Sequence, residues 1–378
     1  MISLENKLTV VHSAAGIAEQ FLSMSIEPQK VAFALCLGGT ETSDIEGISA
    51  AGATPQARRL TPAIDAEALV TGKTFSSETI PVSPIGIVSP VVITRACLNK
   101  LNISARVFDC GSFVSPQNID CAVVGKATGA VVSSGSALSL LTVENLFNEG
   151  KKVGEQLARE HDLVVIAECV PGGTTTALGV LKLLGYEADC LLSSSLPTCG
   201  HDARLELVNQ GIAKAVANGL LLDPLAVIAA VGDPMQPFAA GLAIGASSEV
   251  SKKHVLLAGG SQMLAVHAVV DRLTKRGYTA GLTGGADCNR VVVATTKWVA
   301  FDPAANCSRL AQMLDAPLIA SCPDFSLSRH RGLQAYEEGN VKEGVGAGGA
   351  LALAFHAGFS ETEIVEAIDA TYSEMVAT

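Results

Sequence analysis

DLVVIAECVPGGTTTA, residues 162–177, is the stretch that decides the fold. Its first half, Asp162–Cys169, is a continuous apolar run, typical of a strand buried on both faces of a parallel sheet. Two glycines and three threonines follow, and the apolar segment LGVLKLLG (178–185) then has the composition of a buried helix. A strand, a glycine turn and a helix in this order form the repeating unit of a doubly wound sheet.

The same pattern recurs along the chain. Apolar runs that predict further parallel strands cover 30–39, 103–110, 254–260, 290–296 and 316–322. Helices are expected at 142–161, 174–185, 201–218, 236–249, 261–276, 304–315 and 360–376. Alternating strands and helices joined by short connections predict an α/β fold with a doubly wound, mostly parallel, Rossmann-like sheet. Ligands of such sheets bind beyond the carboxyl ends of the strands.

One region departs from this pattern. Between residues 40 and 135 Gly, Pro, Ser and Thr become dense and the periodicity weakens. We therefore predict a large nucleotide-binding domain from residues 1–39 and 136–360. A smaller helical and loop-rich subdomain is expected from residues 40–135 together with a C-terminal helix at 361–378.

Composition excludes several classes of function. The 378 residues are 48% hydrophobic and carry a formal net charge of −11, which argues against nonspecific binding to nucleic acid or to anionic membranes. Apolar runs are broken before the roughly 20 residues that a membrane helix needs. The N-terminal string MISLENKLTVVHSA (1–14) predicts no secretion signal, and the ten cysteines form no C-x-x-C pair. A cytoplasmic location, reduced thiols and no metal site are expected.

The turn after the strand at 162–169 is the first candidate site. Glycines 172 and 173 allow a ligand to approach the backbone, and Thr174, Thr175 and Thr176 stand where a helix start offers N–H groups to a phosphate. The string matches neither the Walker motif nor the G-x-G-x-x-G fingerprint. Two interpretations stay open at this point, a phosphate loop and a structural glycine turn capped by threonine.

A second string carries a family resemblance. KEGVGAGGALALA (342–354) resembles the late G-E-G-[ST]-G-A-A-L-A string of CobT-type nicotinate-nucleotide:5,6-dimethylbenzimidazole phosphoribosyltransferases, with Lys342 and Val345 as departures. Residues 168–175 are similar to that family's G-E-M-G-I-G-N-T-T, with Gly173 in place of its Asn. Residues 38–50, 223–235 and 324–331 match three further family strings in the same order. The chain is therefore identified as a divergent member of this family.

The resemblance implies a reaction and its participants. The expected enzyme moves phosphoribose from nicotinate mononucleotide to 5,6-dimethylbenzimidazole or a related base, giving α-ribazole 5′-phosphate and nicotinate for cobalamin assembly. Glu343 would be the general base, and Glu168 would orient the ribose or stabilise its cationic transition state. Because the leaving group is already a pyridinium, no general acid and no cofactor are expected. The family forms homodimers, and a homodimer is expected here.

Further site residues follow from the matched strings and from the strand ends. We expect substrate contacts from seven residues besides the glycine turn: Gly39, Ser49, Gly260, Ser261, His330, Gly344 and Gly346. His330 can contact the nicotinate carboxylate or cap a helix, and the sequence leaves both open.

Two departures bear on the substrates. The family's Tyr in the benzimidazole pocket is replaced by Ala51, so the resemblance leaves the acceptor open between a benzimidazole-like and a purine base. The family's phosphate-contacting Lys falls on Val208. His201 or Arg204 can supply that charge or can be ordinary solvated helix residues.

Two other classes of function compete. A catalytically inactive nucleotide-binding or regulatory protein would keep the phosphate loop without turnover, as the departures at Ala51 and Val208 would allow. A nicotinamide-dependent oxidoreductase fits the sheet but lacks the glycine fingerprint.

Overall fold

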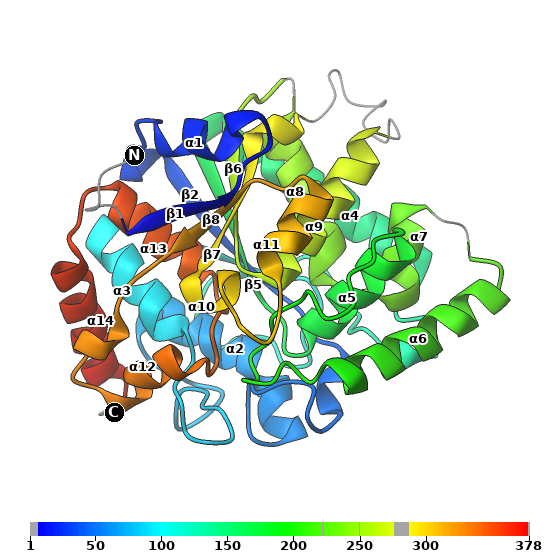
Figure 1. The fold of residues 1–378 in the computed structure, drawn as a ribbon, viewed down its shortest axis with the longest axis horizontal. Coiled ribbons are helices and arrows are strands. Elements are labelled where there is room, and N and C mark those ends of the chain that lie inside the picture. Colours follow the sequence, from blue (N-terminus) through cyan, green and yellow to red (C-terminus); the bar gives the residue numbers. More distant parts are fainter. Residues whose placement is uncertain (1–6, 221–222, 249, 276–286, 377–378) are drawn as a thin grey trace.

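The computed structural model describes residues 7–220, 223–248, 250–275 and 287–376 (Figure 1). These residues form one eight-stranded sheet in the order β1-β8-β7-β6-β5-β2-β3-β4. The strands are β1 Leu8–His12, β2 Val31–Leu37, β3 Ala105–Asp109, β4 Cys121–Val123, β5 Leu163–Cys169, β6 His254–Ala258, β7 Val291–Thr296 and β8 Leu318–Ser321. All neighbours pair in parallel except β1, which runs antiparallel to β8 at the edge. The predicted doubly wound, mostly parallel sheet is confirmed.

The strand order contains one reversal of direction. From β2 the chain moves outward through β3 to β4, and it then returns to place β5 on the other side of β2. Leu37, the last residue of β2, pairs with Cys169, the last residue of β5. The carboxyl ends of these two strands therefore lie side by side at the switch point, where open α/β sheets bind their ligands.

Helices cover both faces of the sheet (Figure 1). One face packs against α2 Pro55–Thr71, α3 Val91–Leu101, α13 Ala347–His356 and α14 Glu361–Val376. The other packs against α4 Leu140–Glu160, α5 Gly173–Leu183, α7 Pro224–Val231, α8 Met235–Ser247, α9 Ser261–Lys275 and α11 Cys307–Leu314, with α6 His201–Ala217 outside them. Successive residues of a strand point to opposite faces. Hence Glu168 and Cys169, the last two residues of β5, face different helical layers.

Glycines allow α4 and α8 to pack with their backbones in contact. A Cβ added at Gly150 or Gly154 of α4 would collide with the carbonyl oxygens of Phe238 and Leu242, and one added at Gly241 of α8 would collide with that of Phe147. Only glycine permits an approach this close. The pair fixes the helical layer behind β2 and β5, and so supports the strands that carry the switch point.

Several elements were not predicted. The edge strands β1 and β4 are short, and β4 is largely exposed. Helices α2 and α3 lie in the region whose Gly and Pro content predicted loops, although Pro62 sits inside α2. Thr54 caps α2 by accepting a hydrogen bond from the Ala57 N–H at 3.1 Å, and Pro55 occupies the first turn, where it costs no hydrogen bond. The predicted subdomain limits stay a prediction.

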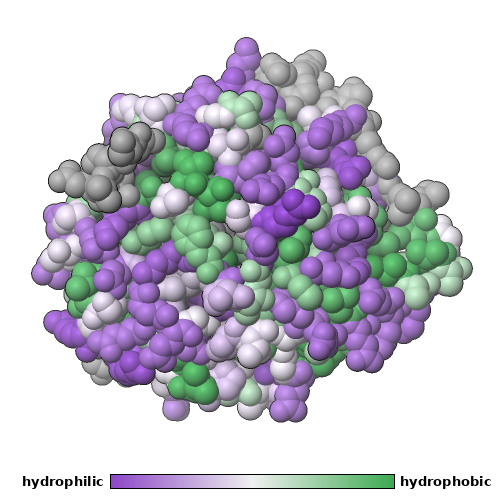
Figure 2. Space-filling model, in the orientation of Figure 1, coloured by the Kyte–Doolittle hydropathy of each residue, from purple (hydrophilic) through white to green (hydrophobic). Residues whose placement is uncertain are grey.

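The expected ends of some helices lie outside the described residues, namely 249, 276, 377 and 378. On the face of the molecule shown in Figure 2, polar residues predominate and apolar areas are small and scattered. No helix within the described ranges is long and apolar enough to cross a membrane.

Candidate active site

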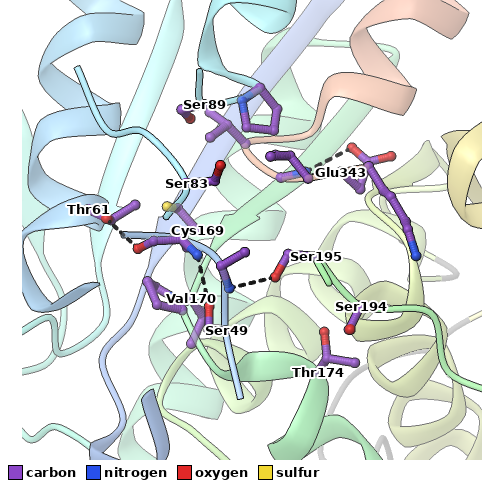
Figure 3. A pocket seen from close by; sticks show the side chains of 18 of the residues that line it. Ser49, Thr61, Ser83, Ser89, Cys169, Val170, Thr174, Ser194, Ser195 and Glu343 are labelled. Atoms are coloured by element: carbon purple, nitrogen blue, oxygen red, sulfur yellow. Dashed lines mark hydrogen bonds between the residues drawn. The ribbon is translucent and has the colours of Figure 1, made fainter. Parts of the chain in front are cut away.

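A pocket opens at the switch point, beyond the carboxyl end of β5 (Figure 3). Its empty space is about 880 Å³, part of which is open solvent. Three groups of residues line it. The first is the segment after β5 together with the starts of α5 and α9. The second comprises α2 and the loops at 48–52 and 81–90, and the third comprises the loops at 193–195 and 341–345.

Glu343 lies in the wall of this pocket, at the carboxyl end of β7. Its Oε2 accepts hydrogen bonds from the Thr295 hydroxyl at 3.0 Å and the Thr296 N–H at 2.9 Å. Its Oε1 accepts from the Gly348 N–H at 2.9 Å and the Gly344 N–H at 3.3 Å. Burial raises the pKa of Glu343 to about 7, although these four donors oppose the shift. The carboxyl is thus rigidly oriented and exchanges a proton near neutral pH.

Glu168 is the second carboxyl of the site and is almost fully buried. Its Oε2 accepts a hydrogen bond from the Val170 N–H at 3.1 Å. Burial and then the nearby Glu343 raise the pKa of Glu168 to about 8, while the Val170 N–H and the Gln262 side chain lower it. Two interacting carboxyls hold a proton between them more readily than either would alone.

Gln262 occupies space that a side chain at position 173 would need. A Cβ added at Gly173 would collide with the Gln262 side-chain oxygen. That oxygen is buried and accepts no hydrogen bond from the described residues. Because Gln262 also lines the pocket, a ligand hydroxyl is a suitable donor for it.

The loop that carries Glu343 is held in a strained conformation. Val341, Lys342 and Val345 have φ of 63°, 64° and 54°, in a region that non-glycine residues rarely adopt. The Lys342 ammonium, 2.5 Å from the Asp302 carboxylate, anchors the loop from within the protein. The Thr94 hydroxyl of α3 donates to the Val345 carbonyl at 3.0 Å. Strain maintained by such contacts is typical of functional sites.

The glycine turn forms the opposite wall of the pocket. Gly172 has a φ of 83° and precedes α5, and a Cβ there would press on the Ser43 backbone. The Thr174 hydroxyl faces the pocket beside Ser194 (Figure 3). Thr176 instead points inward and donates to the Asp233 carboxylate at 2.5 Å. This helix start therefore presents its first turn and Thr174 to the cavity.

The far end of the pocket is lined by hydroxyls and one acid. Thr61 and Asp65 lie one turn apart on α2, and Thr61 donates to the Ala51 carbonyl at 2.8 Å. The Cys169 thiol of β5 donates to Asp65 Oδ2 at 3.4 Å. Ser83 and Ser89 lie beside them on the loop that precedes α3 (Figure 3).

The structure brings eight of the predicted site residues together around one cavity. They are Glu168, Gly172, Thr174, Ser49, Gly260, Ser261, Glu343 and Gly344. Gly173, Thr175, Thr176 and Gly346 are chain neighbours of lining residues but do not line the pocket themselves. Gly39 packs against Phe113, which is not a lining residue.

Three residues considered at the sequence level lie elsewhere. His330 stacks on Tyr372 of α14, with ring centroids 4.2 Å apart, and contacts the Ser373 hydroxyl. It does not line this pocket, and its contact with substrate stays a prediction. Arg204 is buried, donates to the Leu192 carbonyl and to His201, and neither residue lines the pocket. The structure therefore does not supply the missing charge from either.

Other lining residues were missed by the sequence analysis. They are Thr61, Asp65, Ser83, Ser89, the serines 193–195 and Gln262. The string SSS in an otherwise apolar stretch was a usable signal. Asp65 falls on the buried face of a helix that was predicted to be a loop, so nothing marked its burial.

Comparisons with known proteins agree with this geometry. A family model described as Phosphoribosyltransferase (DBI_PRT) matches residues 93–276. The fold resembles the crystal structure of CobT from Thermus thermophilus, with a TM-score of 0.57 and 16% identity over 95% of this chain and 88% of that one. A structure of nicotinate-nucleotide-dimethylbenzimidazole phosphoribosyltransferase from the same organism gives a TM-score of 0.55 and 15% identity, covering 92% and 84%. The chain thus has the fold of the CobT structures, and its middle part matches the phosphoribosyltransferase model.

The chain belongs to the UPF0284 family. A UPF0284 protein of Gloeobacter violaceus is 48% identical over 348 residues, covering 91% of this chain and 87% of the relative. One from Microcystis aeruginosa is 43% identical, covering 89% and 91%, and one from Saccharolobus solfataricus is 38% identical, covering 91% and 93%.

Proposed function

We propose that this chain transfers phosphoribose from nicotinate mononucleotide to a nitrogen heterocycle, 5,6-dimethylbenzimidazole or a related base. One observation carries the proposal: Glu343 and the Gly172 turn line the same pocket at the switch point of the sheet. The phosphate would bind at the start of α5, where backbone N–H groups and the helix dipole favour an anion. The ribose would then lie between that turn and the Glu343 carboxyl.

The chemistry needs one base and no metal. A ring nitrogen of the acceptor attacks C1′ while the bond from C1′ to the nicotinate nitrogen breaks, and its electron pair neutralises the pyridinium. The proton on the second ring nitrogen of the acceptor passes to Glu343, whose pKa of about 7 suits a base at neutral pH. Attack from the opposite face inverts C1′ and gives an α-nucleotide and nicotinate. Glu168 would stabilise the positive charge that develops on the ribose.

The test is release of nicotinate by the purified protein in the presence of several bases. Glu343→Gln keeps the shape of the side chain but cannot accept the proton, so we expect a loss of about 10²-fold or more in turnover. Affinity for nicotinate mononucleotide should stay within about threefold of wild type. Glu366→Gln, an exposed site on α14, is the matched control. Full activity of Glu343→Gln would contradict the proposal.

One observation favours a second candidate, a nucleotide-binding protein without turnover. Both oxygens of Glu343 already accept hydrogen bonds, and Lys342 is the one Lys or Arg among the described residues that line the pocket. Its ammonium is paired with Asp302. Tight nucleotide binding with no nicotinate release from any base would favour this candidate. The family resemblance also leads us to propose a homodimer, whichever of the two functions holds. Sedimentation of the purified protein tests this oligomeric state.

A further inference from the structure

The Glu343 carboxylate accepts four hydrogen bonds, and only one of them comes from a side chain. Backbone N–H groups supply the other three, those of Thr296, Gly344 and Gly348. The side-chain donor is the Thr295 hydroxyl, which donates to Oε2 at 3.0 Å. Thr295 is 1% exposed and does not line the pocket, so it holds the carboxyl from the protein side. A substitution can remove this donor while the backbone donors stay in place.

A hydroxyl can do what a backbone N–H cannot, because it has two lone pairs besides its proton. Each N–H donates to the carboxylate, but it cannot accept a hydrogen bond once Glu343 has gained a proton. The Thr295 hydroxyl donates to Oε2 while that oxygen is charged, and it can accept from Oε2 when that oxygen carries the proton. The hydroxyl therefore keeps its contact with the carboxyl in both protonation states.

The neighbouring threonine provides a direct comparison. Thr295 and Thr296 are the last two residues of β7, and both side chains are buried. The Thr296 hydroxyl donates to the Lys342 carbonyl at 2.6 Å, so its side chain holds the same loop without contacting the carboxylate. The end of β7 thus carries two buried hydroxyls, one on the backbone of the loop and one on the carboxyl of Glu343.

Resting on the proposed function, we infer that Thr295 is a positioning residue for Glu343. Its hydroxyl donates to the carboxylate before proton transfer and accepts from the carboxyl afterwards. In that step the ring N–H bond of the acceptor base breaks, its electron pair stays on the ring, and the proton forms an O–H bond to Oε2 of Glu343. Thr295 gives up no proton and contacts no substrate.

Other groups act on the same carboxyl from other elements. Glu168 of β5 and the Tyr336 phenol interact electrostatically with Glu343, and the adjoining Lys342 is paired with Asp302. Removing the hydroxyl leaves all of these groups in place. Burial raises the pKa of Glu343 and the hydroxyl opposes that shift, so its removal raises the pKa further. Less carboxylate is then present at neutral pH.

The test is the pH dependence of nicotinate release by the full chain, with the best acceptor among the bases tried. Thr295→Val has nearly the same shape without the hydroxyl. Its turnover at neutral pH should fall at least about tenfold, the effect expected for a lost hydrogen bond to a charged group. The rise of the rate with pH should move to higher pH, while affinity for nicotinate mononucleotide stays within about threefold of wild type. Thr295→Ser keeps the hydroxyl and should restore the wild-type profile.

Infrared titration of the Glu343 carboxyl follows the same proton without turnover. The spectrum of Glu343→Gln is subtracted, so that the remaining carboxyl signal belongs to Glu343. The midpoint should be higher in Thr295→Val than in wild type. It should not move in Thr296→Val, the matched control, which removes an equally buried hydroxyl from the same strand. Thermal unfolding shows whether each variant folds, and Thr295→Ala replaces Thr295→Val if the latter does not.

Three results separate the inference from the proposed function. An unchanged pH profile and infrared midpoint in Thr295→Val, or an equal shift in Thr296→Val, would overturn the inference. An infrared shift in a protein that releases no nicotinate would leave the inference standing and remove the transferase proposal. Nicotinate release that Thr295→Val does not alter would do the reverse.

Discussion

At the residue scale, the pocket is lined by three carboxyls whose pKa values are raised. Burial raises the pKa of Asp65 to about 7, that of Glu168 to about 8 and that of Glu343 to about 7. At neutral pH these side chains therefore exchange protons with a ligand instead of presenting three fixed negative charges. In the proposed function, this would reduce the repulsion of an anionic nucleotide by a pocket whose Lys342 is already paired with Asp302.

Lys342→Met tests the anchor of the Glu343 loop. The Lys342 and Asp302 side chains are 1% and 2% exposed, so removing the ammonium leaves a buried carboxylate without its cationic partner. Losses of this kind are about 3–5 kcal/mol, and we expect a decrease of that order in the free energy of unfolding, measured with denaturant. Adding Asp302→Asn should recover part of it. If Lys342→Met alone were as stable as wild type, the ion pair would not anchor the loop.

Sequence patterns identified some of these residues and missed others. Glu168, Gly172 and Glu343 stand in strings whose order along the chain is distinctive, and all three line the pocket. Asp65 and Gln262 reach it only because α2 and the start of α9 lie beside the end of β5. No pattern in the neighbouring sequence identifies such residues, because their role arises from contacts between segments that are distant in the chain.

At the element scale too, the sequence predicted some features and missed others. Strands β2, β5, β6 and β7 could be predicted almost to the residue, because a strand buried on both faces is a continuous apolar run. Helix α2 could not, since its Gly-rich and Pro-rich surroundings resemble a loop and only its cap at Thr54 signals a helix start. The loop at 341–346 owes its shape to backbone strain, which no propensity predicts.

Gly241→Ala tests the contact between α4 and α8. Alanine is the better helix former, yet a Cβ at this position would collide with the Phe147 carbonyl. Overpacking typically costs about 1–3 kcal/mol, so a clear fall in Tm is expected in calorimetry. Asn148→Ala, exposed on α4, raises helix propensity without a collision and should not lower Tm. If Gly241→Ala were the more stable of the two, the described packing would be wrong.

For the whole molecule, the buried carboxyls set the dependence of stability on pH. Asp65, Glu168 and Glu343 keep a proton in the folded chain at pH values where the unfolded chain has lost it, since their ordinary values are 3.8, 4.5 and 4.5. The folded state binds more protons, so stability falls as pH rises toward about 8. Buried His267, whose pKa is lowered to about 4, has the opposite effect only below its ordinary value of 6.5.

We therefore predict that the denaturation midpoint decreases between pH 6.5 and 8. Each such group contributes a slope of up to about 1.4 kcal/mol per pH unit. Glu168→Gln removes one group, so its slope should be shallower and its stability at pH 8 higher than that of wild type. A midpoint that rises across this range would show that these carboxyls are ionised in the folded protein.

The central claim is that one cavity at the switch point holds a nucleotide between α5 and Glu343. A crystal structure with bound nicotinate mononucleotide tests it most directly. The account predicts phosphate oxygens within hydrogen-bonding distance of the backbone N–H groups at the start of α5, with C1′ facing the Glu343 carboxyl. A nucleotide bound outside this cavity, or one with its phosphate at the α2 end and C1′ turned away from Glu343, would contradict it.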